Sequence, residues 1–189
     1  SGLRRKLSEH PPTEIYAVRG RLTQEELTTK LGWSTPHVFG DPAALLPIYY
    51  QPRPKSGRST SIVPHYIHKQ YFNDLECDKV SVIDVQQHPA EVIDEIANSK
   101  VIISTSLHGI ICAQAYQVPW VWLQIPSEDV RGGAFKFEDF FTNLDRESVS
   151  HVQVQPEDIC RQFVERIVQT AALPKERTNY QALHDSLPV

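Results

Sequence analysis

Residues 101–123, which read VIISTSLHGIICAQAYQVPWVWL, contain the pattern that decides the fold. The apolar run that begins this stretch predicts a buried strand, and the polar turn at 104–106 ends it. An apolar, small-residue segment opens at Leu107 and predicts a helix, which Pro119 ends before a second apolar strand. A strand, a turn, a helix and a strand in this order are typical of a parallel sheet.

The sequence on both sides of this stretch alternates in the same way. Apolar runs at 60–64 and 79–84 predict strands. Helices are predicted at 89–98, which has a proline in its first turn, at 136–144, which is aromatic, and at 156–171, which is amphipathic. The alternation predicts an α/β fold, with a parallel sheet covered by helices on both faces. In such a sheet, ligands bind at the carboxyl ends of the strands, where the turn at 104–106 would lie.

The segment at 51–59, QPRPKSGRS, is the best candidate for a boundary inside the chain. It divides the chain into residues 1–59 and residues 60–189. Before the boundary, we expect short strands at 14–18 and 38–39. Between them we expect a helix with Thr23 at its N-cap, ending near Gly32.

Composition limits the classes of function. The chain has 189 residues, 40% of them hydrophobic and 22% charged, and a net charge of −4, which argues against general nucleic-acid binding. Its three cysteines are widely spaced and form neither a metal-ligand pattern nor a disulfide framework, so we expect a reducing compartment. No apolar run approaches the length of a transmembrane span, so we expect no transmembrane segment.

His108 is the first candidate for chemistry, because it lies at the entrance of the predicted helix at 107–115. Free backbone N–H groups and the positive end of the helix dipole favour an anion there. The imidazole can hold or release a proton near neutral pH. The alternative is a histidine that only caps the helix. Ser104 and Ser106 precede His108 without an identifiable third member of a nucleophilic triad.

Two further candidates lie near the N-terminus. Arg19 and Arg21 flank Gly20 and could bind a phosphate or carboxylate, or could be solvated surface arginines. Asp41 follows Gly40 on a tight turn and could orient a ligand hydroxyl or a catalytic base. The alternative for Asp41 is an Asx turn that shapes the loop.

Weaker candidates follow in the second half of the chain. His65 ends a predicted strand and would face the ligand edge, or be a partly exposed histidine. The spacing of His65 and His68 could suit a metal, but no third ligand is evident, so we expect no metal site. Lys136 and Asp139 are spaced to pair one turn apart on a helix.

The order of these motifs resembles the polysaccharide pyruvyl transferase family, over roughly residues 14–145. The motifs that carry the resemblance are, in chain order, VRGRLT at 18–23, GDPAALLP at 40–47, IVPHY at 62–66, STSLHGIICA at 104–113 and KFED at 136–139. The Leu-His-Gly and Asp-Pro-Ala-Ala-Leu-Leu-Pro segments are the most specific of them.

The resemblance implies two Rossmann-like domains in a glycosyltransferase-B-like arrangement, with a cleft between them. We expect the N-terminal domain to be largely missing, so that 1–59 is the last part of the first domain plus a linker, and 60–189 is the second domain with C-terminal helices. The implied reaction transfers a pyruvyl group from phosphoenolpyruvate to a sugar or oligosaccharide acceptor, lipid-linked or free. The resemblance implies no cofactor besides this donor, and a cytoplasmic location, in solution or peripheral at the membrane.

In this family, the histidine of Leu-His-Gly corresponds to His108 as the catalytic acid/base, and the arginine of the Arg-Gly turn corresponds to Arg19 as a ligand for phosphoenolpyruvate. The full set of expected substrate-binding residues is Arg19, Arg21, Asp41, His65, Ser104, Ser106, Leu107, Gly109, Lys136 and Asp139.

One departure concerns the position before Leu-His-Gly, where many family members carry arginine and this chain has Ser106. Arg21, Arg131 or Lys136 are the candidates to replace that cation. Two other functions remain open from the sequence: a glycosyltransferase that uses a nucleotide-sugar donor, and a non-catalytic domain that binds a sugar or an anion.

Overall fold

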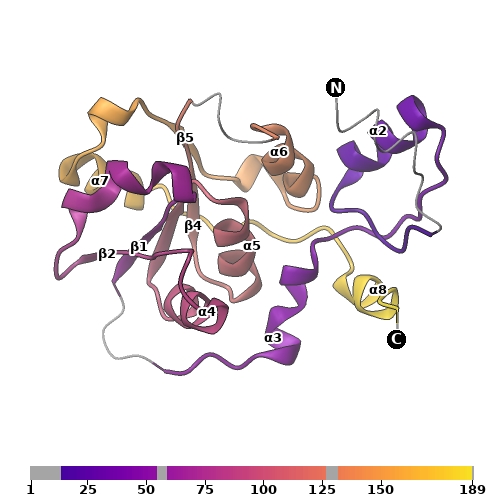
Figure 1. Ribbon diagram of the computed structural model, residues 1–189, viewed down its shortest axis with the longest axis horizontal. Coiled ribbons are helices and arrows are strands. Elements are labelled where there is room, and N and C mark those ends of the chain that lie inside the picture. The colour runs from indigo at the N-terminus through magenta and orange to yellow at the C-terminus, as the bar shows by residue number, and fades with distance from the viewer. Residues whose placement is uncertain (1–13, 55–58, 127–131, 189) are drawn as a thin grey trace.

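The computed structural model describes residues 14–54, 59–126 and 132–188. Its centre is a five-stranded parallel sheet with strand order β2-β1-β3-β4-β5. The strands are β1 (Thr60–Val63), β2 (Val80–Val82), β3 (Val101–Ser104), β4 (Trp120–Gln124) and β5 (His151–Gln153). The predicted parallel α/β fold is therefore confirmed, and Figure 1 shows the strands side by side.

Helices cover both faces of the sheet, as the alternating pattern predicted. On one face lie α4 (Pro89–Ala97), α5 (Leu107–Ala115) and α6 (Phe135–Phe141). On the other lie the 3₁₀ helix η2 (Tyr66–Leu75) and α7 (Arg161–Val168). Strands buried on both faces need continuous apolar sequence, and β3 is buried along its whole length.

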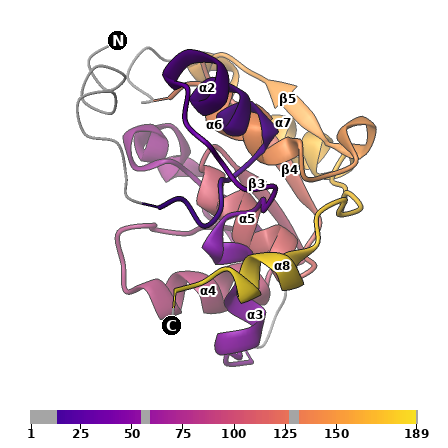
Figure 2. The ribbon, with the colours of Figure 1, turned by 90° about the vertical axis from the view of Figure 1, so that its right-hand side faces the viewer.

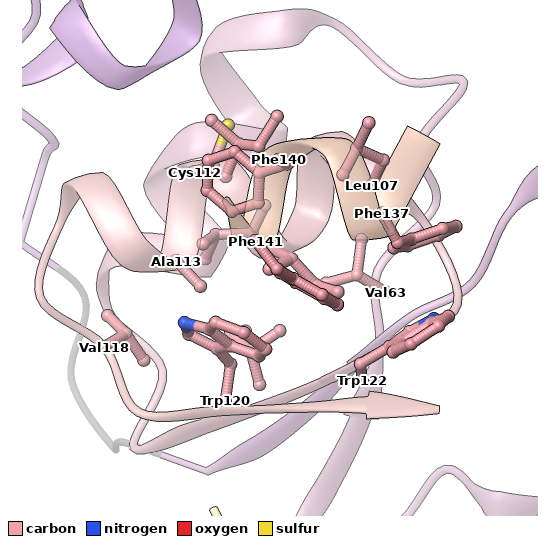
Figure 3. Packing of buried hydrophobic residues seen from close by; sticks show 14 of the residues in the cluster. Val63, Leu107, Cys112, Ala113, Val118, Trp120, Trp122, Phe137, Phe140 and Phe141 are labelled. Carbon is pink, nitrogen blue, oxygen red and sulfur yellow. The ribbon is translucent and has the colours of Figure 1, made fainter. Parts of the chain in front are cut away.

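The first core cluster is aromatic (Figure 3). Trp120 and Trp122 of β4 lie against Phe137 and Phe141 of α6, and the ring centroids of Trp122 and Phe137 are 4.9 Å apart. The indole N–H of Trp120 donates to Oε1 of Gln114, so this buried polar group is satisfied. This packing fixes α6, and with it the first residues of that helix, over the end of β4.

The N-terminal part forms a separate layer beside the sheet. It contains α2 (Arg21–Leu31), the 3₁₀ helix η1 (Pro42–Leu45) and α3 (Leu46–Tyr49). Figure 1 shows α2 away from the strands, and Figure 2 shows it beside α6. The strands expected at 14–18 and 38–39 are only a single parallel bridge between Val18 and Phe39.

Two further boundaries differ from prediction. Helix α2 begins at Arg21 with Gly20 as its N-cap, because Thr23 uses its hydroxyl on Asp139 instead of capping the helix. The helix ends at Gly32, which has the expected left-handed conformation with φ of 68°. The helix predicted from residue 156 begins only at Arg161, since extended backbone at Cys160 follows a short 3₁₀ turn.

The C-terminal segment crosses back to the N-terminal layer (Figure 1). The remaining elements are the 3₁₀ helices η3 (Arg146–Ser148) and η4 (Pro156–Asp158) and the helix α8 (Tyr180–Asp185). Helix α8 lies against η1, so that a Cβ at Gly40 would be 2.7 Å from Cδ2 of Leu183. Within the described residues, no helix combines the length and the apolar character needed to cross a bilayer.

Candidate functional site

The site begins at the turn between β3 and α5. Ser106 is the N-cap of α5 and its side chain makes no capping hydrogen bond, so the first N–H groups of the helix have no side-chain partner there. Beneath the turn, Oγ of Ser104 lies 2.8 Å from the carbonyl oxygens of Val63 and Ser106 and accepts from the N–H of Ser106 at 3.0 Å. Ser104 is fully buried and shapes the turn.

Gly109 allows α5 to begin close to the sheet. A Cβ at this position would lie 2.5 Å from Oγ of Ser104 and 2.7 Å from Cγ1 of Val63. Glycine therefore lets the helix entrance approach the ends of β1 and β3, where the neighbouring residue His108 faces outward and is 71% exposed.

His108 pairs with Asp41 from the N-terminal layer. Nε2 of His108 lies 3.7 Å from Oδ2 of Asp41, while the other carboxylate oxygen accepts from the N–H of Ala43. Asp41 thus forms the Asx turn and also faces the histidine. Its carboxylate raises the pKa of His108, against burial and the charges of Arg19 and Lys136. Burial acts to raise the pKa of Asp41, but His108, the Ala43 N–H and Arg19 together lower it.

Arg19 reaches the same region because Gly20 lets the chain pass directly over α6. A Cβ at Gly20 would lie 1.9 Å from the backbone oxygen of Asp139, a distance no other residue could accept. Nε of Arg19 lies 3.3 Å from Oδ2 of the fully buried Asp139, and the Arg19 carbonyl accepts from Nδ2 of Asn143 at 2.6 Å. No described residue hydrogen-bonds the two terminal nitrogens of Arg19, which leaves them for a ligand.

Arg19, Ser106, His108 and Gly109 line one cavity of about 460 Å³, whereas Asp41 and Asp139 are not among its lining residues. Its polar side is formed by residues from four separate parts of the chain, namely Arg19, His65, Ser106, His108 and Lys136. Its apolar side is formed by the end of β1, by α4 and by α5, with Val63, Val92, Ile93 and Leu107 among the lining residues. Both the size and the mixture of apolar walls with a few polar groups are typical of small-molecule sites.

The cavity is electropositive. Burial and the charge of Arg19 lower the pKa of Lys136, and burial and the charge of Lys136 lower the pKa of His65. No described carboxylate forms an ion pair with Lys136. An anionic ligand would reduce the repulsion between like charges in a half-buried site, so the arrangement suits a small anion beside a titratable histidine.

The structure does not bring all of the candidate residues to this cavity. Arg21 turns away, donating to the carbonyl of Thr142 at 2.7 Å and lying over the ring of Phe39. Asp139 pairs with Arg19 and Thr23 rather than with Lys136, and is buried beneath the site. Ser104 is likewise beneath it. Arg131 lies outside the described residues.

Two parts of the lining were not singled out as site residues from the sequence. Tyr66, the last residue of the IVPHY motif, is 60% exposed at the rim, with its ring 4.6 Å from that of His65, and α4 supplies an apolar wall. The segment of α4 was predicted as a helix, but its sequence cannot say what the apolar face of that helix covers. No group of three or more His, Cys, Asp or Glu side chains arranged to hold a metal occurs in the described part of the chain.

Comparison with known proteins places this geometry in context. Residues 3–125 match the family described as polysaccharide pyruvyl transferase. The succinoglycan biosynthesis protein ExoV of Rhizobium meliloti (strain 1021) is 33% identical over 146 residues, which are 73% of this chain and 43% of that protein. The uncharacterized protein L143 of Acanthamoeba polyphaga mimivirus is 29% identical over 136 residues, 68% of this chain and 47% of that protein.

The chain thus spans less than half the length of these two curated relatives. No solved structure matches it. The cavity residues Arg19, His65, Ser106 and His108 all lie inside the matched region, while Lys136 lies just beyond it.

Proposed function

The chain belongs to the polysaccharide pyruvyl transferase family, and we propose that it transfers a pyruvyl group from phosphoenolpyruvate to a sugar of a polysaccharide or its precursor. One observation carries the proposal: Arg19, His108 and Lys136, far apart in the sequence, line a single cavity beside the His108–Asp41 pair. Phosphoenolpyruvate carries a phosphate and a carboxylate and needs several cationic or N–H donors, which this cavity offers.

Arg19 and Lys136 are proposed to bind the two anionic groups of the donor. The terminal guanidinium nitrogens suit a bidentate contact, and the amine of Lys136 supplies a point charge. Lys136 is our proposed replacement for the arginine that many relatives carry at the position of Ser106, since Arg21 is directed away. The uncapped N-terminus of α5 adds backbone donors on the same side.

His108 is proposed as the acid and base. Its protonated form gives a proton to the methylene carbon of the enol, which makes the neighbouring carbon electrophilic, and a sugar hydroxyl then adds there and gives its proton to the neutral imidazole. A second hydroxyl displaces phosphate from the same carbon and closes a cyclic ketal, and the proton of that hydroxyl leaves with the phosphate. Asp41 favours the protonated imidazole because it raises the pKa of His108, so the acid form is populated nearer neutral pH.

This scheme uses only the side chains of the protein and its two substrates. We propose no metal or additional cofactor. We also propose a cytoplasmic location, in solution or at the membrane surface, where phosphoenolpyruvate would be available to an acceptor that is free or lipid-linked.

Thermal unfolding with added ligands tests the donor directly. We expect phosphoenolpyruvate to raise the melting temperature of the chain more than uridine or guanosine diphosphate at equal concentration, because ligands that bind the native state stabilise it by mass action. A larger effect of a nucleoside diphosphate would instead favour a nucleotide-sugar glycosyltransferase. Binding without release of phosphate in the presence of acceptor glycan would favour a non-catalytic anion-binding domain.

Replacement of the histidine separates binding from chemistry. We expect His108→Asn to lower the rate of phosphate release from phosphoenolpyruvate by about 10²–10⁴-fold, the usual contribution of a general acid. The melting temperature should change little, because the side chain is 71% exposed. The matched control is His37→Asn, which changes an exposed histidine of the N-terminal layer that is absent from the cavity lining. Wild-type turnover in His108→Asn would reject the assignment.

A further inference from the structure

A second, smaller cavity lies next to the anionic site at the same edge of the sheet. Its volume is about 200 Å³, and its lining combines the ends of β3 and β4 with the start of α6. Its lining residues include His68, Thr105, Trp122, Gln124 and Phe137. Ligand sites of whole drug-sized molecules are larger, roughly 300–1,000 Å³, so this cavity suits one small ring or part of one.

His68 is a buried histidine that lines this cavity and has an unpaired ring nitrogen. The residue is only 3% exposed, and its Nε2 is buried without any hydrogen-bond partner among the described residues. A buried unpaired polar atom costs stability, so such an atom in a residue that lines a cavity requires an explanation. A ligand oxygen in the cavity would provide the missing partner.

The hydrogen bonds around Thr105 decide what that nitrogen offers. Oγ1 of Thr105 accepts from the backbone N–H of His65 at 2.8 Å and lies 3.1 Å from Nδ1 of His68. Thr105 is buried, and its hydroxyl hydrogen has no other acceptor among the described residues, which favours the tautomer of His68 in which Nδ1 accepts. An imidazole that accepts at Nδ1 carries its proton at Nε2, so in this tautomer the unpaired nitrogen of His68 is an N–H donor.

The environment of that donor selects a neutral ligand. Burial, and the charges of His65 and Lys136, lower the pKa of His68 to about 4, so the imidazole is uncharged at neutral pH. The cavity walls include Trp122, Leu123, Ile125 and Phe137, which disfavour a charged group. The amide of Gln124 adds a second polar group. A neutral, hydroxyl-bearing ring matches this combination.

The position of the cavity gives the ligand its role. His65 lines the anionic cavity, His68 lines the smaller one, and the centroids of their rings are 6.0 Å apart. Lys136 and Phe137, consecutive on α6, face the anionic and the smaller cavity respectively. Group transfer requires donor and acceptor to be held side by side.

We propose that the cavity at His68 binds a sugar ring of the acceptor, whose hydroxyl oxygen accepts a hydrogen bond from Nε2–H of His68. The inference rests on the proposed function, because it names the acceptor subsite of the same transfer. His68 acts here as a binding residue and takes no part in proton transfer.

The decisive experiment measures two ligands on the same variants of the 189-residue chain. Methyl glycosides of glucose, galactose and mannose are titrated by saturation-transfer NMR, and phosphoenolpyruvate by calorimetry. We expect His68→Phe to weaken the glycoside that binds wild type by about tenfold, the loss of one buried hydrogen bond, and to leave phosphoenolpyruvate affinity within about twofold. His68→Gln should restore glycoside binding, because its amide can donate from a similar position.

Nitrogen NMR of the histidine rings gives a readout that needs no ligand. We expect the His68 ring to be neutral at pH 7 with its proton on Nε2, and Thr105→Val to disturb that state. A ring protonated at Nδ1 would overturn the proposal.

Three binding results would also overturn it: no glycoside binds the wild-type chain, glycosides bind His68→Phe as they bind wild type, or phosphoenolpyruvate rather than the glycoside is lost. Failure of the proposed function looks different, because phosphoenolpyruvate would then fail to bind the wild-type chain or would bind independently of Arg19 and His108.

Discussion

The unit of β3, α5 and β4 and the N-terminal layer at 14–50 each supply part of the cavity, but they are held by different interactions. Seven of the nine residues of α5 are buried, and β3 is buried throughout. Helix α2 has no buried residue at all. The segment formed by Arg19 and α2 is instead attached by polar contacts, among them the Arg19–Asp139 ion pair and the Asn143 bond to the Arg19 carbonyl. The 3₁₀ helix η1 of the same layer is held by apolar packing, since Ala43 and Ala44 contact the first core cluster.

Because the two regions are held by different interactions, folding of the sheet and assembly of the site depend on different residues. Hydrophobic burial is strong and tolerant of small displacements, whereas hydrogen bonds and ion pairs lose their energy when the geometry changes. Substitutions in the unit of β3, α5 and β4 should therefore unfold the protein. Substitutions at the polar attachment of Arg19 and α2 should loosen that segment and move Arg19 away from His108.

The largest effect is expected from Trp120→Ala in the aromatic core. Trp120 is fully buried against Phe141, and its indole N–H satisfies Gln114, so its loss leaves a large cavity and an unpaired amide. We expect the free energy of unfolding to fall by about 3–5 kcal/mol in urea titrations. The exposed Ile48→Ala is the control and should change it by less than about 0.5 kcal/mol. Equal free energies of unfolding for the two variants would contradict the expected dependence of the fold on the buried aromatic core.

Asp139→Ala tests the attachment. Its carboxylate accepts from the N–H and the hydroxyl of Thr23 and pairs with Arg19, so three partners lose their acceptor. We expect the free energy of unfolding to fall by about 2–3 kcal/mol. The loss should not be larger, because the segment formed by Arg19 and α2 can be released while the sheet stays folded. Hydrogen exchange should accelerate in α2 while the amides of β3 and α5 stay protected. Uniform acceleration throughout the chain would show that the two regions unfold together.

Gly20→Ala tests the same attachment sterically. The added Cβ would lie 1.9 Å from a backbone oxygen of α6, and a backbone atom cannot rotate away. We expect a destabilisation of about 1–3 kcal/mol and weaker binding of phosphoenolpyruvate, because Arg19 must shift.

Gly32→Ala is the control for this substitution. It adds a Cβ in open space at a left-handed residue, which costs about 1 kcal/mol without moving the site. Wild-type phosphoenolpyruvate affinity in Gly20→Ala would contradict the steric argument.

The smallest effect concerns the His108–Asp41 pair that joins the two regions. Because the pKa of His108 is raised, its contribution to the free energy of unfolding is fully present below the ordinary pKa of 6.5 and is lost as pH rises through the folded-state pKa. Because the pKa of Asp41 is lowered, its contribution to the free energy of unfolding is present above the ordinary pKa of 3.8 and is lost as pH falls through the folded-state pKa.

The stability difference between wild type and Asp41→Asn should therefore be largest between about pH 4 and 6.5. Because His108 is mostly exposed, we expect only about 0.2–1 kcal/mol. Urea titrations across pH measure it. A stability difference that grows above pH 7 would contradict the expected loss of the pair as His108 deprotonates.

Much of the fold followed from local pattern. The apolar runs and the proline at 119 predicted the strands and helix of 101–123, and the structure confirms the parallel sheet with helices on both faces. The edge strand β5, with two of its three residues exposed, and the 3₁₀ helix η2 were not predicted, because neither has a long periodic apolar pattern.

For the candidate site, residue type and position after a strand made His108, Arg19 and Asp41 candidates, and Lys136 was a candidate because of its spacing from Asp139 on a predicted helix. The same reasoning could not separate Arg19 from Arg21, which differ only in what each contacts across the fold. It also gave His68 little weight, because a buried nitrogen without a partner becomes visible only when its surroundings are known.

The sequence by itself determined most of the strands and helices of the central sheet, and that a histidine lies at a helix entrance, because these depend on interactions within a few residues. Only the tertiary structure decided which distant charges meet in one cavity and which serve as internal supports. That outcome depends on close approaches such as Gly20 over Asp139, which bring together residues more than a hundred positions apart and leave no periodic trace in the chain.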